Sequence, residues 1–253
     1  MTPMIELGCK SDTGIAREVN EDAFAAILDA HIYMVADGVG GNSAGEVASR
    51  TAIRTVVEQV ENAPLEPTGD ELDVRRYFTR CLELANASVK AVGESFPENS
   101  GLATTLVLCY IEDETAYFVN VGDSRGYLYR DGQLTRITED HSYVNTLVRM
   151  GVLTEEEARH HKRGNVITRA IGAEDTVTGD LFPIELQEGD VLLLCTDGLH
   201  GEVLPGQMEQ LMAEHEDMQE LCDALVDAAN ENGGRDNITC ITLRYLGGNV
   251  NEQ

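Results

Sequence analysis

The chain has 253 residues and carries 45 Asp and Glu against 18 Lys and Arg, for a formal net charge of −27. This charge repels nucleic-acid backbones and anionic membrane surfaces, so it argues against partners of either kind. Apolar residues make up 42% of the chain, which argues against a disordered protein, and the length fits one large domain or at most two small ones. Because the sequence has no evident interdomain linker, we expect one domain over 1–253.

The N-terminal part of the chain predicts a hairpin followed by two helices. Residues 23–28 and 32–36 are short apolar runs joined by three residues, as in a β-hairpin. After a glycine-rich turn over 37–42, apolar residues recur at helical spacing over 44–60, and again over 72–95.

The middle of the chain predicts a β-meander and then an insertion. Four strands of the meander are expected over 103–111, 115–121, 126–130 and 133–137. The segment 138–172 is polar, with short helical patches near 142–150 and 154–161. We therefore expect 138–172 to form a flap, and Thr154 with the acids after it to cap and begin its second helix.

The C-terminal part adds strands over 179–186 and 191–196, helices over 205–214 and 217–232, and a last strand over 237–245. Strands that neighbour strands and helices that neighbour helices predict two antiparallel sheets packed face to face, with the helices outside. The fold class is therefore α+β.

Four Asp residues occupy one kind of position in these predicted elements. Asp37, Asp123 and Asp197 each follow a predicted strand, and Asp236 directly precedes the last one. A single Asp-Gly pair is usually only a turn, as at 131–132. Four strand-end carboxylates at a shared edge would repel one another without a cation, and oxygen ligands of this kind select Mg²⁺ or Mn²⁺.

Other functional motifs are absent or incomplete. The glycine-rich stretch over 37–45 has Ser43 where the third glycine of a dinucleotide-binding loop belongs, and the helix after it leads to another helix. The sequence has no phosphate-binding P-loop, no H-E-x-x-H and no G-x-S-x-G motif. These observations argue against a nucleotide-binding loop, a zinc protease and a serine hydrolase.

Seven short motifs together resemble one known family, the metal-dependent Ser/Thr protein phosphatases of the PPM (PP2C-like) type. Each motif is weak alone, but the seven occur in the family's order and span about residues 6–245. They are Arg17-Glu-Val-Asn-Glu-Asp22, Asp37-Gly-Val-Gly-Gly41, Gly101-Leu-Ala-Thr-Thr105, Asn120-Val-Gly-Asp-Ser-Arg125, Thr138-Glu-Asp-His-Ser142, Cys195-Thr-Asp-Gly-Leu199 and Asp236-Asn-Ile-Thr239.

This resemblance implies an αββα sandwich and a binuclear Mn²⁺ or Mg²⁺ centre. Asp37 would bridge the two ions, and Asp197 and Asp236 would complete the carboxylates of the first. The Gly38 carbonyl, with Glu21 partly through water, would hold the second ion.

Three further residues receive roles from the resemblance. Asp22 would be either a ligand or a supporting acid, and the sequence leaves both open. Asp123, together with Asp197, resembles the acid that binds a third metal in bacterial members. Arg17 resembles the phosphate-binding arginine, whose planar guanidinium fits two phosphate oxygens at once.

The implied reaction is hydrolysis of phosphoserine and phosphothreonine monoesters on proteins by a metal-bridging water, without a covalent intermediate. Eukaryotic members have a His directly after the Asp-Gly pair, whereas this chain has Val39, which excludes a His general acid there. A metal-bound water, His141 or His161 could protonate the leaving group instead. For either His, a capping or surface role is the alternative.

The expected partners are phosphorylated proteins that a Ser/Thr protein kinase supplies, and we expect a monomer. The sequence has no run of about 18 apolar residues and no signal peptide. Its six Cys include no C-x-x-C pair, which favours a reducing, cytoplasmic compartment.

Two other hypotheses remain beside a general phosphatase. One is a non-catalytic sensor that kept the PPM fold, and the other is a dedicated regulatory phosphatase for an anti-sigma-type partner. The retained Arg17, Asp37, Asp197 and Asp236 argue against the sensor, while Arg17 and the flap favour the general phosphatase.

Overall fold

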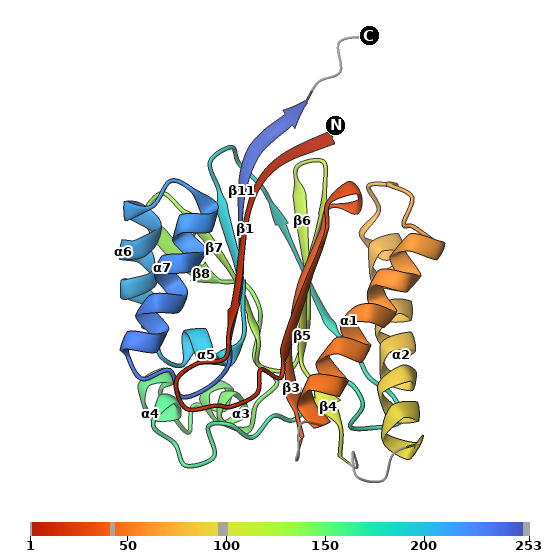
Figure 1. Ribbon diagram of the computed structural model, residues 1–253. Coiled ribbons are helices and arrows are strands. Elements are labelled where there is room, and N and C mark those ends of the chain that lie inside the picture. The colour runs from red at the N-terminus through yellow and green to blue at the C-terminus, as the bar shows by residue number, and fades with distance from the viewer. Residues whose placement is uncertain (1, 41–43, 96–100, 250–253) are drawn as a thin grey trace.

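The computed structural model describes residues 2–40, 44–95 and 101–249. Two antiparallel sheets lie face to face, and a pair of helices covers the outer face of each sheet (Figure 1). The α+β fold class and the αββα sandwich that the sequence predicts are thus confirmed.

The first sheet contains both ends of the chain, in the strand order β1-β11-β10-β7-β8. Its strands are β1 (Thr2–Asp12), β11 (Ile238–Asn249), β10 (Val191–Cys195), β7 (Arg125–Arg130) and β8 (Gln133–Arg136). β1 pairs with β11 from Thr2, opposite Asn249, to Asp12, opposite Ile238. Both termini therefore lie at the same end of the sandwich (Figure 1).

The second sheet has the order β2-β3-β5-β6-β9, with the short β4 paired to β3. Its strands are β2 (Asp22–Ile27), β3 (Ile32–Val39), β4 (Ala103–Thr104), β5 (Leu106–Glu112), β6 (Thr115–Val121) and β9 (Asp180–Glu185). β2 and β3 form the predicted hairpin, which turns through a 3-10 helix at Leu28–Ala30.

The helices lie where the sequence periodicity predicts them. α1 (Ala44–Asn62) and α2 (Glu71–Ser95) cover the second sheet, and α6 (Pro205–Glu214) and α7 (Met218–Glu231) cover the first (Figure 1). No helix among the described residues is long and apolar enough to span a bilayer.

Strand residues alternate between the two faces of their sheet. Tyr33 and Val35 of β3 enter a buried cluster between the sheets, together with Leu192 of β10. The residues that alternate with them, Ile32 and Met34, instead join the buried cluster formed with α1 and α2. Apolar side chains therefore fill a layer between the sheets and a layer beneath each helix pair.

The segment 138–172 carries two short helices, α3 (Tyr143–Arg149) and α4 (Glu155–Arg159), at the end of the sandwich opposite the termini (Figure 1). The Thr154 hydroxyl accepts a hydrogen bond from the backbone N–H of Glu157, and the Glu157 carboxylate accepts one from the backbone N–H of Thr154. The predicted N-cap of the second flap helix is confirmed.

The predicted β-meander is wrong. The β5–β6 hairpin belongs to the second sheet and the β7–β8 hairpin to the first, so the chain crosses between sheets at residues 122–124. The predicted turn over 37–42 also starts too early, because β3 continues to Val39, which pairs with Ala103. The rest of that turn, over 41–43, lies outside the described residues.

Candidate functional site

Asp side chains from both sheets come together at the end of the sandwich that carries the segment 138–172. Asp22 begins β2 and pairs directly with Asp37 of β3. Asp197 begins the four-residue helix α5 (Asp197–His200) just after β10, and Asp236 lies two residues before β11. Asp123 lies where the chain crosses between the sheets.

Burial and mutual repulsion raise the pKa values of Asp22, Asp37, Asp123 and Asp197. Burial, with added repulsion from Asp197 and Asp236, raises the pKa of Asp22 to about 7. Burial and the charge of Asp197 likewise raise the pKa of Asp123 to about 8. The pKa values of Asp37 and Asp197 are also raised, first by burial and then by neighbouring acids. The ionised cluster is therefore unfavourable unless a cation neutralises it.

Two oxygen atoms of the cluster fit such a cation. Asp22 Oδ1 and Asp197 Oδ1 are buried and have no hydrogen-bond partner among the described residues. A carboxylate-rich donor set of this kind suits Mg²⁺ or Mn²⁺ rather than zinc. Within residues 2–40, 44–95 and 101–249, no three His, Cys, Asp or Glu side chains are already grouped as a ligand set.

Glu21 and Gly38 lie side by side beneath the start of α1. Gly38 donates its backbone N–H to the Glu21 carbonyl at 3.1 Å, and Glu21 Oε1 accepts from the Gly45 N–H at 3.2 Å. A Cβ at Gly38 would lie 2.0 Å from the Gly45 carbonyl oxygen and 2.6 Å from that of Glu21. Only glycine fits at this position, because any side chain would separate β3 from α1.

Arg17 is the one predicted site residue with a permanent positive charge. Its Nη2 lies 2.7 Å from Asp236 Oδ2, and its side chain is 48% exposed. The charges of Asp236, Glu21 and Asp197 raise the pKa of Arg17 against the opposing effect of burial. The guanidinium therefore stands at the border of the acidic cluster, where it can reach both the acids and solvent.

Hydroxyl side chains hold two of the acids in place, and sequence analysis assigned no role to these hydroxyl groups. Thr196 Oγ1 donates to Asp22 Oδ2 at 2.8 Å. Thr105 Oγ1 accepts from the backbone N–H of Asp37 at 2.9 Å, and the Thr105 N–H donates to the Asp37 carbonyl at 2.9 Å. Both threonines lie inside the motifs quoted above, which was the only signal for them.

Asn237 is a second residue whose function sequence analysis missed. Its side chain is buried and accepts from the Glu21 N–H at 2.9 Å. Its Nδ2 donates to the carbonyls of Thr13 and Val19 at 2.8 and 2.9 Å. A single amide therefore fixes the loop that carries Arg17 and Glu21 next to Asp236.

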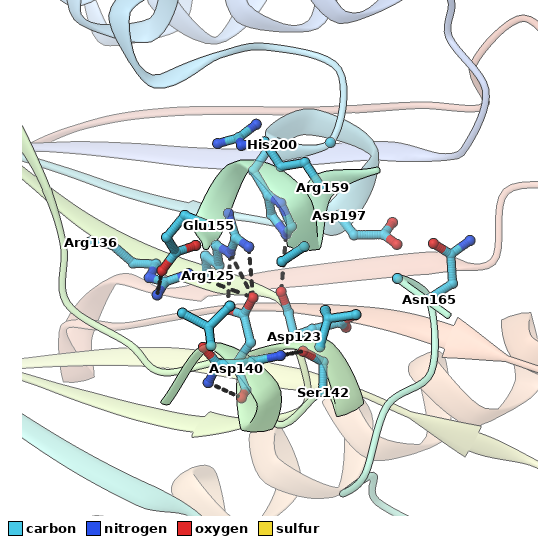
Figure 2. A pocket seen from close by; sticks show the side chains of 16 residues that line it. Asp123, Arg125, Arg136, Asp140, Ser142, Glu155, Arg159, Asn165, Asp197 and His200 are labelled. Atoms are coloured by element: carbon cyan, nitrogen blue, oxygen red, sulfur yellow. Dashed lines mark hydrogen bonds and ion pairs between the residues drawn. The ribbon is translucent and has the colours of Figure 1, made fainter. Parts of the chain in front are cut away.

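A cavity of about 150 Å³ adjoins the acids on the side of the segment 138–172. Figure 2 shows Asp123 and Asp197 at its wall, with Arg159 and Asn165 from the segment also lining it. Beside them, Arg125 makes a bidentate pair with the buried Asp140, at 2.9 Å and 2.6 Å (Figure 2). The cavity therefore connects the acidic cluster to the predicted flap.

The two predicted candidates for a leaving-group acid lie in different surroundings. His141 is buried, and both of its ring nitrogens make hydrogen-bond contacts within the protein. His161 contacts its neighbours in the segment 138–172: its Nδ1 accepts from the Arg163 N–H at 3.1 Å, and its ring lies 6.1 Å from that of Tyr143.

Sequence comparison places these residues in a known family. The family model described as protein phosphatase 2C matches residues 15–241, and the chain belongs to this family. The serine/threonine phosphatase stp of Listeria monocytogenes is 36% identical over 237 residues, which cover 92% of this chain and 93% of that protein. The resemblance that the seven motifs indicate is thus confirmed.

Solved structures agree with this assignment. The Stp1 serine/threonine phosphatase of Staphylococcus aureus superposes with a TM-score of 0.88 at 31% identity, covering 98% of this chain and 97% of that one. The catalytic domain of the PstP phosphatase, solved in complex with 2 manganese ions, has a TM-score of 0.85 at 33% identity, covering 97% of this chain and 100% of that one.

Proposed function

We propose that this protein hydrolyses phosphoserine and phosphothreonine monoesters on proteins, and that it uses two divalent ions, Mn²⁺ or Mg²⁺. The observation that carries the proposal is the cluster of Asp22, Asp37, Asp123, Asp197 and Asp236, whose ionised form needs a cation. The relatives named serine/threonine phosphatase and the manganese-bound PstP domain support the same activity.

We assign the ion-binding roles as follows. Asp37, Asp197 and Asp236 would hold the first ion, and Asp37, the Gly38 carbonyl and Glu21, partly through water, would hold the second. Two such ions supply a water made nucleophilic near neutral pH and a positive clamp on the phosphoryl oxygens.

Asp22 and Asp123 take secondary roles in this proposal. We assign Asp22 as a supporting acid, because Thr196 donates to its Oδ2 and leaves only the buried Oδ1 to face an ion. Asp123 faces the cavity beside Asp197, and these two acids would hold a third ion.

Arg17 binds the phosphate of the substrate. Its half-exposed guanidinium now pairs with Asp236, and an ion that attracts Asp236 would release it. The planar fork of the freed guanidinium matches two phosphate oxygens. Arg17 would thus orient the phosphoryl group of the substrate only when metal ions occupy the acidic cluster.

The substrates in this proposal are proteins that a Ser/Thr protein kinase has phosphorylated. We place all of 1–253 in one catalytic domain, with 138–172 as its flap, acting as a cytoplasmic monomer. The six cysteines are free thiols, five of them buried, which suits a reducing compartment. A net charge of −27 argues against nucleic acid and anionic membranes as partners.

Metal-dependent turnover of p-nitrophenyl phosphate and of a phosphothreonine peptide tests the proposal. Asp37→Asn and Asp236→Asn should each abolish turnover and weaken Mn²⁺ binding measured by calorimetry. Asp131→Asn, in the exposed turn between β7 and β8, removes the same charge and should change neither. Near-normal turnover by the first two variants would contradict the assignment, and an inactive wild-type protein would favour the non-catalytic sensor.

A further inference from the structure

His141 belongs to the segment 138–172 and contacts the crossing at residues 122–124, which carries Asp123. Its side chain is only 8% exposed. Its backbone N–H donates to the Gly122 carbonyl at 2.8 Å, and its ring Nδ1 accepts from the Gly122 N–H at 3.0 Å. One residue therefore binds both backbone polar groups of Gly122, the residue directly before Asp123.

The backbone conformation of Gly122 and the space around it both require glycine. Its φ of +105° lies in a region that favours glycine, and an added Cβ would lie 2.5 Å from Thr105 Cγ2. On the other side, the Asp123 carbonyl accepts from His200 Nε2 at 3.0 Å (Figure 2). The backbone that aims the Asp123 carboxylate is thus held by a histidine at each end.

The outer edge of the His141 ring contacts a second group of polar residues. Nε2 lies 3.0 Å from Asp180 Oδ2, and Arg169 Nη1 lies 2.9 Å from Asp180 Oδ1. Because Nδ1 accepts from Gly122, the neutral ring carries its proton on Nε2 and donates it to Asp180. Burial lowers the pKa of His141, which favours this neutral form.

We propose that His141 is a positioning residue that holds Asp123 in place through Gly122, with its ring oriented by Asp180 and Arg169. This inference rests on the proposed phosphatase function and on Asp123 as an ion-binding acid. It also assigns His141 a role other than the leaving-group acid, since both ring nitrogens are engaged with protein groups. Loss of a group that orients a metal ligand typically weakens metal affinity about 10- to 100-fold.

Two substitutions test the contact of Nδ1 with Gly122 and the contact of Nε2 with Asp180 separately. In His141→Asn, Oδ1 can replace Nδ1 as the acceptor for Gly122. In His141→Gln, the longer amide can reach Asp180 but leaves the Gly122 N–H without its acceptor. Asp123→Asn should remove the binding of one Mn²⁺ ion. We expect His141→Gln to weaken the binding of that same ion by about 10-fold or more. His141→Asn should retain most of the affinity for it.

Mn²⁺ titration followed by electron paramagnetic resonance measures this binding directly. In an Asp123→Asn background, His141→Gln should cause no further loss, because both changes affect the same ion. His215→Gln, at a histidine whose Nδ1 contacts the Leu211 carbonyl at the end of α6, is the matched control and should bind Mn²⁺ as wild type does. Wild-type Mn²⁺ binding by His141→Gln would overturn the proposal.

Turnover of two substrates separates positioning from acid catalysis. The p-nitrophenolate group leaves without protonation, whereas the alkoxide of a phosphoserine peptide needs an acid. A positioning role predicts the same fold-loss in kcat for both substrates in His141→Gln and substantial rescue in His141→Asn. A loss confined to the peptide would make His141 the leaving-group acid instead. Absence of metal-dependent turnover in the wild type would refute the proposed function itself.

Discussion

The substitution Asp22→Asn should stabilise the metal-free protein, although it removes a residue of the acidic cluster. Asp22 is 5% exposed, and its pKa rises from 3.8 to about 7 on folding, chiefly through burial. At 1.36 kcal/mol per pKa unit, keeping this group ionised in the native state costs at most about 4 kcal/mol. Asn keeps an acceptor for Thr196 and carries no charge.

The stabilisation by Asp22→Asn should change with pH in a definite direction. Because the folded pKa of Asp22 is raised, the native state keeps a proton that the unfolded chain has lost between about pH 4 and 7. The stability that this retained proton provides is present at low pH and is lost as the pH rises from about 4 to 7. The advantage of Asp22→Asn should therefore be less than half as large at pH 5 as at pH 8, where it reaches its full size.

Thermal unfolding in EDTA, followed by circular dichroism at pH 5 and pH 8, measures the size of the stabilisation and its dependence on pH. At pH 8 the melting temperature of the variant should exceed that of the wild type by on the order of 10 °C. Asp131→Asn is the control, because Asp131 is an exposed turn residue with φ of +53°, a conformation that Asn tolerates. The reasoning fails if Asp22→Asn is less stable than wild type at pH 8, or if its advantage is the same at both pH values.

Three further predictions concern packing and charge. Asp140→Ala leaves Arg125, whose side chain is only 15% exposed, without its bidentate partner and should cost about 3–5 kcal/mol in urea unfolding; an unchanged midpoint would contradict this. Leu193→Ala, at a fully buried position in β10, should cost about 2–5 kcal/mol by the same measurement, more than any substitution at an exposed site. Added salt should lower KM for strongly acidic phosphopeptides by screening the charge of −27, and a KM that rises would show that the local cations dominate.

Sequence patterns predicted the long amphipathic helices to within two residues. Predicted helices over 44–60 and 72–95 correspond to α1 (Ala44–Asn62) and α2 (Glu71–Ser95), because each buries one continuous face against a sheet. β1 and α5 were not predicted. β1 is an edge strand with few fully buried positions, and α5 has only four residues, too few for a periodic pattern.

Local sequence patterns could not predict which strands belong to which sheet. Gly122 and the two residues after it are a short link, which in sequence is indistinguishable from the turn of a meander. In the structure the link crosses between sheets, and its path depends on contacts with Thr105, His141 and His200, which are distant in sequence. The acids themselves were predictable from their motifs, whereas these supporting contacts required the fold.

Because β1 pairs with β11, the first and last strands lie side by side, and the same fold could form from a chain that begins and ends elsewhere. Thr2 lies opposite Asn249, so a short linker could join the ends without moving either strand. New ends could open in the loop between α1 and α2, where residue 66 is exposed and lies far from the acidic end (Figure 1). A circularly permuted enzyme of this kind would bring the first and last motifs, Arg17 and Asp236, onto one continuous stretch of chain while leaving every strand pair intact.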